Sequence, residues 1–245
     1  MARDRHAPSR WGRAIAAAVA APALSGTALS EPPIASAAGM PRGYDVSSHQ
    51  KNVDWEQTRS EGAKFVYVKA TEGTSYRNPY FSQQFGGARD AGMLRGAYHF
   101  ALPGKSSGKR QAAYFLRHGG RWSADGWTLP PAVDLEAAYG SMCHGRSQAG
   151  MVGWIKSFSG EVKRITGRRP VIYTTAKWWN SCTGGSRRFG RNHALWLANW
   201  HSSPGPMPSG WSYSTIWQYA ERGRLPGDQN LFNGSLSQLK RFSRG

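Results

Sequence analysis

The alternation of strand-like and helix-like segments from residue 43 onward limits the fold more than any other feature. Strand patterns occur at 43–48, 64–73, 94–103, 129–138 and 169–175. Helix patterns separate them at 54–62, 78–92, 107–120 and 147–167. Apolar strands that alternate with helices are typical of a parallel sheet whose outer face is covered by helices.

The rhythm changes in the last third of the chain. Strand patterns continue at 194–200, 214–220 and 228–234, with only a weak helix between the fifth and sixth strands. About eight strands in one domain predict an α/β fold, a modified TIM-like (β/α) barrel with few helices in its last third. An open, doubly wound sheet is the alternative, but no G-x-G-x-x-G loop follows the first strand.

The first 37 residues carry a targeting pattern. Four arginines precede an alanine-rich apolar stretch at 14–29, and Ala35 and Ala37 form an A-x-A cleavage site. We predict a cleaved signal peptide over 1–37 and a single catalytic barrel domain over 38–245. A membrane anchor is the alternative; no later stretch approaches the length of a membrane span. The expected product is secreted, extracellular and wall-associated, without stable membrane insertion.

The charge of the chain predicts a polyanionic partner. The formal net charge is +18, and removal of residues 1–37 leaves 28 basic and 12 acidic side chains. Nucleic acid is one candidate, but the basic residues form no long run and no nucleic-acid motif, and export conflicts with that role. Electrostatic attraction to a bacterial wall that carries anionic polymers is the favoured interpretation.

Two cysteines, Cys143 and Cys182, are present. In an exported protein they are expected to form one disulfide, with two free thiols as the alternative. They follow the fourth and fifth predicted strands, so both belong to loops on one face of the barrel.

Acidic side chains occur at the ends of the predicted strands. Asp134 and Glu136 lie two residues apart, so they point to the same side of the fourth strand at its C-terminal end. Asp45 has the corresponding place on the first strand, and Asp228 begins the last one. Acids gathered at one barrel mouth raise each other's proton affinity, as glycoside hydrolysis requires. In the alternative, the D-x-E arises by chance and Asp45 and Asp228 only stabilise turns.

Other chemistries lack their motifs. The acids have no histidine pair at metal-ligand spacing, and Phe232 occupies a position where a calcium loop needs an oxygen ligand. A Ser-His-Asp hydrolase would require G-x-S-x-G, which is absent. We therefore expect no metal and no cofactor.

Aromatic side chains on or near the strands could stack against sugar rings. These are Tyr98, Tyr139, Tyr173, Trp196, Trp200, Trp217 and Tyr219. Core packing is the alternative for each of them. His99 is expected to be a packing histidine rather than a base.

Several motifs, taken in order, resemble the glycoside hydrolase family 25 lysozymes, which are N-acetylmuramidases. They are "GYDVSSHQ", "FVYVKATEGT", "RGAYHFA", "PAVDLEA", "PVIYTT", "LWLANW" and "WQYA" followed by "GDQNLFNG". Together they cover nearly all of residues 43–234. The family's modified barrel, with fewer outer helices in its last third, agrees with the pattern described above.

The resemblance implies roles for individual residues. Glu136 matches the general acid, Asp134 the carboxylate two residues before it, Asp45 the first-strand acid and Asp228 the acid of the terminal D-x-N segment. The implied substrate-binding residues are Tyr98, Tyr139, Tyr173, Trp196, Trp217 and Glu72. Chitinases with a similar fold use a D-x-D-x-E motif. Ala132 occupies the first position of that motif in this sequence, which argues against a chitinase.

The implied reaction is cleavage of the β-1,4 bond between N-acetylmuramic acid and N-acetylglucosamine in peptidoglycan. Asp134 would orient the N-acetyl group as internal nucleophile or, alternatively, activate water. A non-catalytic wall-binding or lectin-like barrel is the competing hypothesis, although all four acids are retained. A monomer is expected.

Overall fold

A computed structural model describes residues 39–245, which contain one nine-stranded sheet. The predicted signal peptide, 1–37, lies outside the described residues. The strands are β1 (Arg42–Val46), β2 (Phe65–Glu72), β3 (Tyr76–Arg77), β4 (Leu94–Phe100), β5 (Ala132–Asp134), β6 (Val171–Thr174), β7 (Leu195–Ala198), β8 (Ile216–Ala220) and β9 (Asp228–Phe232).

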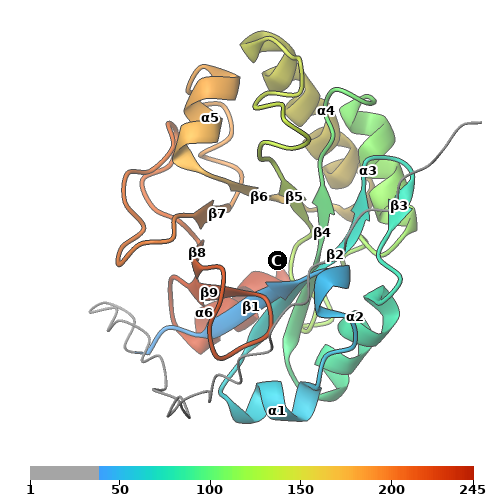
Figure 1. Cartoon of the computed structure of the whole chain (residues 1–245), viewed down its shortest axis with the longest axis vertical. Coiled ribbons are helices and arrows are strands. Elements are labelled where there is room, and N and C mark those ends of the chain that lie inside the picture. The colour runs from blue at the N-terminus through green and yellow to red at the C-terminus, as the bar shows by residue number, and fades with distance from the viewer. Residues whose placement is uncertain (1–38) are drawn as a thin grey trace, which may run out of the picture. The chain divides into compact units, whose positions relative to one another are not determined.

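Eight of these strands close into a barrel (Figure 1). Their order is β1-β9-β8-β7-β6-β5-β4-β2, and β1 pairs with β2 to complete the ring, while β3 extends β2 as a short hairpin. Strand β9 is antiparallel to both β1 and β8, and the other barrel pairings are parallel. The predicted α/β barrel with about eight strands is thus confirmed.

Helices surround only part of the barrel (Figure 1). They are α1 (Trp55–Ser60), α2 (Phe81–Asp90), α3 (Gly108–Arg117), α4 (Gln148–Thr166), α5 (Ala176–Thr183) and α6 (Leu236–Arg244), with a 3-10 turn at Ser48–Gln50. Loops without helices connect β7, β8 and β9, as expected for the last third. Helix α6 is not among the helices predicted from the sequence, although a capping box between Ser235 and Gln238 marks its start.

Helix α4 shows how the sequence specifies an outer helix. Met151, Trp154 and Phe158 are buried at helical spacing. The Ser147 hydroxyl accepts a hydrogen bond from the third backbone N–H of the helix, and Gly167 ends the helix with φ of 76°. A left-handed residue at this position favours glycine, so the predicted helix over 147–167 and its end are confirmed.

Strand β5 is shorter than the predicted 129–138. Pro130 and Pro131 have no N–H to donate to a neighbouring strand, and the chain leaves the sheet after Asp134. Val133 and Leu135 pack in the core between the barrel and the helices, whereas Ala132 packs inside the barrel. This alternation turns Asp134 into the barrel at the C-terminal end of the strand.

Candidate active site

A pocket of about 230 Å³ opens at the C-terminal ends of the parallel strands and contains all four predicted acids. Asp45 comes from β1, Asp134 from β5, and Glu136 follows β5 directly. Asp228 is the first residue of the antiparallel β9, which brings it to the same end of the barrel. Barrel enzymes place their reactive groups at this end.

Two amide side chains hold the pair Asp45 and Asp228. These acids lie opposite each other in the β1–β9 pairing. Gln218 Nε2 donates to Asp45 Oδ2 at 3.0 Å and to Asp228 Oδ2 at 3.1 Å. Asn230 Nδ2 donates to Asp45 Oδ2 at 2.7 Å. Because amide N–H groups stabilise a carboxylate anion, these contacts oppose the effect of burial on Asp45.

Indole N–H groups fix the direction of both amides. Trp196 Nε1 donates to Asn230 Oδ1 at 2.7 Å, and Trp200 Nε1 donates to Gln218 Oε1 at 3.0 Å. An indole nitrogen is only a donor, so it must face the amide oxygen. The NH₂ groups of Asn230 and Gln218 are therefore directed at the acids. Sequence reasoning missed both amides.

Asp134 is the acid of the pocket with a buried oxygen atom that lacks a partner. Its side chain is buried, and its Oδ1 has no hydrogen-bond partner. Burial, with the charge of Glu136 next in importance, raises the pKa of Asp134 well above the usual value. A buried acceptor without a partner is rare in folded proteins and favours a contact with a ligand.

The other three acids also hold their protons more tightly than usual. Burial raises the pKa of Glu136 to about 7, with Lys69 opposing the shift and Asp228 adding to it. Burial also raises the pKa of Asp228 to about 6. Burial and the charge of Asp228 together raise the pKa of Asp45 to about 8. Glu136 can therefore be a proton donor near neutral pH.

Lys69 is the cation of the pocket, and sequence reasoning missed it as well. Its Nζ lies 2.6 Å from Glu72 Oε2 and 4.4 Å from the centre of the Phe100 ring. The Tyr139 hydroxyl donates a hydrogen bond to the other oxygen of Glu72. Glu72 and Tyr139 do not line the pocket themselves, but they hold Lys69, which does, in place.

The predicted aromatic residues divide into two groups. Tyr98, Tyr173 and Trp196 line the pocket, as expected for a sugar site. Trp217 does not: Ile216 packs inside the barrel and Gln218 faces the pocket, so Trp217, between them, points outward. It is 5% exposed, and its indole N–H donates to the Asn199 carbonyl. Trp217 therefore lies outside the group of residues that line the pocket, because alternation along β8 turns Gln218 inward instead, and its contact with substrate stays a prediction.

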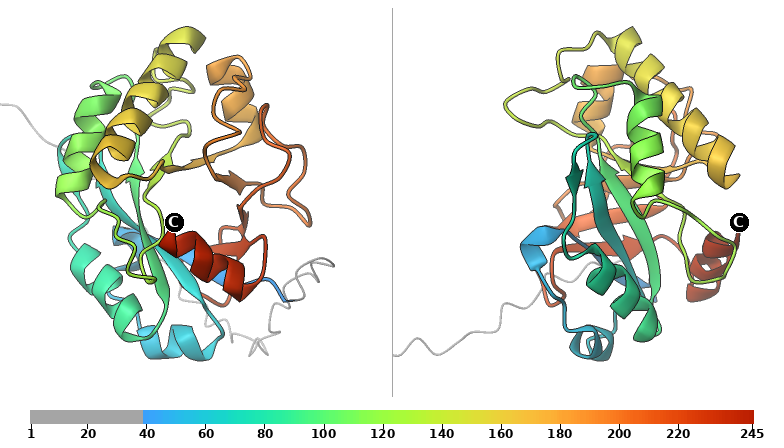
Figure 2. Two further views of the ribbon diagram at one scale, coloured as in Figure 1. Left: turned by 180° about the vertical axis from the view of Figure 1, so that it is seen from behind. Right: turned by 90° about the vertical axis from the view of Figure 1, so that its right-hand side faces the viewer.

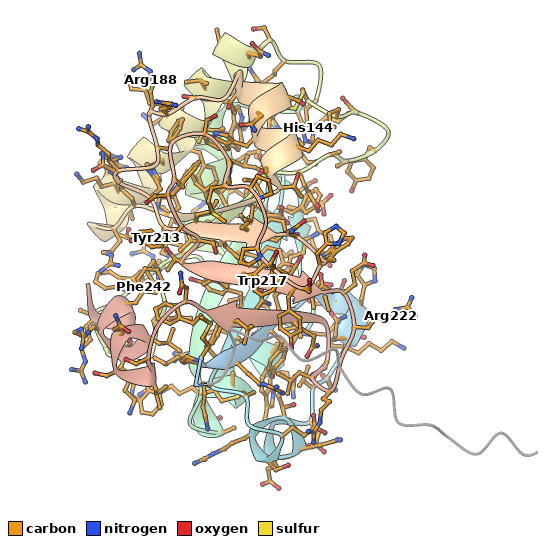
Figure 3. All side chains as sticks on the ribbon, turned by 90° about the vertical axis from the view of Figure 1, so that its left-hand side faces the viewer. His144, Arg188, Tyr213, Trp217, Arg222 and Phe242 are labelled. Carbon is orange, nitrogen blue, oxygen red and sulfur yellow. A yellow bond between two sulfur atoms is a disulfide. The ribbon has the colours of Figure 1, made fainter. Side chains whose placement is uncertain are left out.

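The loop after β5 carries Glu136 into the pocket and contains one half of a disulfide. The predicted disulfide between Cys143 and Cys182 is present, with Cα atoms 5.3 Å apart. His144, seen beside α5 in Figure 3, has its Nε2 2.8 Å from the Glu136 carbonyl oxygen. The bridge therefore anchors to α5 the same loop that contacts the backbone of Glu136.

His99 is a packing residue, as expected. Its Nε2 lies 3.0 Å from Gln111 Oε1, and its Nδ1 lies 2.8 Å from the Thr71 hydroxyl. Since the Gln111 oxygen can only accept, Nε2 carries the proton and Nδ1 accepts from Thr71. Burial lowers the pKa of His99 to about 4, so the ring is neutral and has no free nitrogen for catalysis.

No group of three or more His, Cys, Asp or Glu side chains in 39–245 is arranged to hold a metal ion. Over the same range, no helix combines the length and apolar character needed to cross a membrane.

Comparison with known proteins agrees with this geometry. The sequence profile of glycosyl hydrolases family 25 matches residues 44–228. An N,O-diacetylmuramidase of Arthroderma benhamiae is 46% identical over 233 residues, 95% of each chain. Another, from Chalaropsis sp, is 48% identical over 209 residues, 83% of this chain and 99% of that protein. The solved structure of a family 25 lysozyme from Aspergillus fumigatus is 46% identical with a TM-score of 0.83, covering 84% of this chain and 100% of that one.

The matched segment includes all four carboxylates of the pocket and most of the chain. The relatives align over more than two thirds of both chains. This protein belongs to the glycosyl hydrolases family 25.

Proposed function

We propose that this glycoside hydrolase is a secreted muramidase that cleaves the β-1,4 bond between N-acetylmuramic acid and N-acetylglucosamine in peptidoglycan. The observation that carries the proposal is the convergence of four carboxyl groups in one pocket of a family 25 barrel. Relatives named N,O-diacetylmuramidase and lysozyme support the substrate. We further propose that the chain acts as a monomer and associates with the wall through its positive charge.

In the first step, Glu136 protonates the glycosidic oxygen as the bond to C1 of N-acetylmuramic acid breaks. The acetamido oxygen of the same sugar attacks C1 and forms an oxazolinium ion. Asp134 Oδ1, which lacks a partner in the free protein, accepts a hydrogen bond from the acetamido N–H, whose acidity increases as the ring closes. Asp134 thereby holds the internal nucleophile beneath C1.

In the second step, Glu136 is a carboxylate and removes a proton from water while the water oxygen attacks C1. The bond between C1 and the acetamido oxygen breaks, so the acetamido group is restored and the configuration at C1 is retained. Asp228, whose pKa is raised only to about 6, supplies negative potential beside the developing positive charge, and Asp45 shares the Gln218 amide with it. Tyr98, Tyr173 and Trp196 provide aromatic surface for the sugar.

Product analysis tests the proposal. Purified peptidoglycan is digested with the wild-type protein or with Glu136→Gln, and the new reducing ends are reduced with borohydride and identified by mass spectrometry. Muramitol from the wild type alone supports a muramidase with Glu136 as acid. Glucosaminitol would mean that the other bond is cleaved. An absence of new ends with wild-type protein would favour the non-catalytic wall-binding alternative.

A further inference from the structure

A second, larger hollow of about 430 Å³ lies at the end of the barrel opposite the carboxylates. We call it the basal groove, and its key lining residues are Arg59, Lys64, Trp127, Lys240 and Arg244. Helix α6 closes this end because Leu239 packs into the interior of the barrel with residues from the starts of the strands. Figure 2 shows α6 and the loop before β5 on this side of the barrel.

The groove has an excess of positive charge. Lys64, Lys240 and Arg244 have no carboxylate within ion-pair distance among the described residues. Arg59 is held in place by a 2.8 Å hydrogen bond from its Nη1 to the Ala91 carbonyl oxygen. Unpaired cations that converge from separate elements on one hollow create a local positive potential that attracts anions.

The single acid of the groove does not neutralise these cations. Asp125 Oδ1 accepts hydrogen bonds from the backbone N–H groups of Trp127 and Thr128 at 2.9 and 2.7 Å. Its Oδ2 accepts the Thr128 hydroxyl at 2.9 Å and lies 3.7 Å from Arg89 Nη1. Asp125 therefore shapes the loop that carries Trp127 and is balanced by Arg89, which lies outside the groove.

We propose that the basal groove binds phosphodiester-linked anionic polymers of the bacterial wall. Lysine ammonium groups bind phosphate as point charges, and arginine can bind two phosphate oxygens at once. Trp127 is 38% exposed, so its ring offers apolar surface to the carbon units between phosphates. The choice of a wall polymer, rather than nucleic acid or lipid, rests on the proposed peptidoglycan substrate.

The groove is separate from the reaction. Lys64 precedes β2 and Glu72 ends it, so eight residue steps, roughly 26 Å of extended chain, divide the groove from the mouth. A polymer in the groove and a glycan in the pocket can therefore be bound together. Loss of the groove should weaken attachment to walls without changing hydrolysis of a soluble glycan.

The test compares two triple variants that each remove three positive charges. Lys64→Ser/Lys240→Ser/Arg244→Ser alters the groove, and Lys156→Ser/Arg169→Ser/Arg188→Ser alters another basic hollow. Co-sedimentation is measured with walls that carry polyol phosphate polymers and with the same walls after hydrofluoric acid has removed them. Lys240→Glu serves as a second groove variant if the triple variant does not fold, since Lys240 is exposed on α6.

We expect the wild type and the control triple to bind intact walls about tenfold more tightly than stripped walls, and the groove variants to lose this preference. All variants should hydrolyse soluble peptidoglycan fragments with the wild-type kcat/KM. Equal loss in both triples, or equal wild-type binding to both wall preparations, would overturn the proposal. So would a groove-dependent loss of binding to anionic lipid vesicles or DNA with wall binding intact.

The outcome is independent of the catalytic proposal. If the wild type releases no muramic acid ends from stripped walls, the muramidase assignment fails while the binding comparison still decides whether the groove takes the polymer.

Discussion

Trp196 directs the Asn230 amide toward Asp45. The indole N–H donates to Asn230 Oδ1 at 2.7 Å, and Asn230 Nδ2 then donates to Asp45 Oδ2 at 2.7 Å. Trp196 lies on β7 and Asn230 on β9, two strands that are not neighbours in the sheet. An aromatic residue of the pocket floor thus controls the hydrogen bonding of an acid across the barrel.

Removing this indole donor should impair the site through Asp45. Trp196→Phe frees the Asn230 amide to rotate and present its oxygen to the carboxyl group. We expect kcat to fall by about tenfold, the low end for losing a hydrogen bond to a charged group. The pH profile of kcat/KM should also shift, because Asp45 would bind its proton more tightly. Trp217→Phe, on the outer face, is the control and should leave the profile in place.

The decline of activity on the alkaline side of the pH profile, its basic limb, should follow the titration of Glu136. Burial raises the pKa of Glu136 to about 7, so the proton donor is lost as the pH rises through that value and activity should decline. Lys69 opposes this shift, so Lys69→Met should move the basic limb to higher pH, whereas Lys69→Arg should restore it. A Lys69→Met profile with an unmoved basic limb would contradict the role given to this cation.

Asp134→Asn should inactivate the enzyme by about 10²- to 10⁴-fold yet stabilise its fold at alkaline pH. Burial raises the pKa of Asp134 above its unfolded value, so the folded chain holds the proton longer and the free energy of unfolding falls as pH rises between the two values. We expect the variant's Tm to exceed that of the wild type by roughly 2–4 °C at pH 8, equivalent to about 1 kcal/mol.

The same difference in Tm should vanish near pH 4, where Asp134 is protonated in the folded wild type. Comparing variant with wild type at each pH cancels the opposite contribution of His99, whose pKa is lowered to about 4. An equal Tm gain at both pH values would show that the carboxyl charge is not its source.

The disulfide should account for much of the thermal stability of the loop region. Cys143 and Cys182 are 39 residues apart, and closing such a loop is worth about 4 kcal/mol in the chain-entropy model. Cys143→Ser should therefore lower Tm by roughly 10 °C in oxidising buffer. Scans with a reductant provide the control: the wild type should then approach the variant, and the variant itself should not change.

The hydrogen bond between Tyr139 and Glu72 should affect substrate binding more than chemistry. Tyr139→Phe removes the only polar atom of the ring while keeping its shape, and it releases one side of the Glu72–Lys69 pair. We expect KM for peptidoglycan fragments to rise by a few-fold with kcat nearly constant. Tyr213→Phe, which changes a tyrosine that is 63% exposed, should leave both constants unchanged.

The sequence predicts the acids of the site well because each lies at a strand end where alternation and motif order agree. It predicts the amides poorly. Gln218 lies between Trp217 and Tyr219, and aromatic residues are the more usual candidates for contact with a sugar ring. Only the inward position of Ile216 shows that the glutamine faces the pocket. Parity along β2 would likewise have revealed Lys69, since it shares a face with Phe65 and Tyr67.

Other differences have local causes. The two residues of β3 are too few to give a periodic pattern. The capping box at Ser235 and Gln238 is a readable start signal for α6, but the helix is short and lies in the part of the chain expected to lack helices. The basal groove depends on α6, so it could not be anticipated without that helix.

Because β9 is the last strand, the active site can form only after nearly the whole chain has been synthesised. Asp45 meets Asp228 across a separation of more than 180 residues, and β9 also provides the pairing that joins β1 to β8. A nascent chain whose residue 228 has not yet left the ribosome contains three of the four acids, but its barrel is not closed. Hydrolytic activity therefore requires the last strand, and a polypeptide truncated before β9 should not hydrolyse peptidoglycan, because it lacks Asp228 and the pairing that closes the barrel.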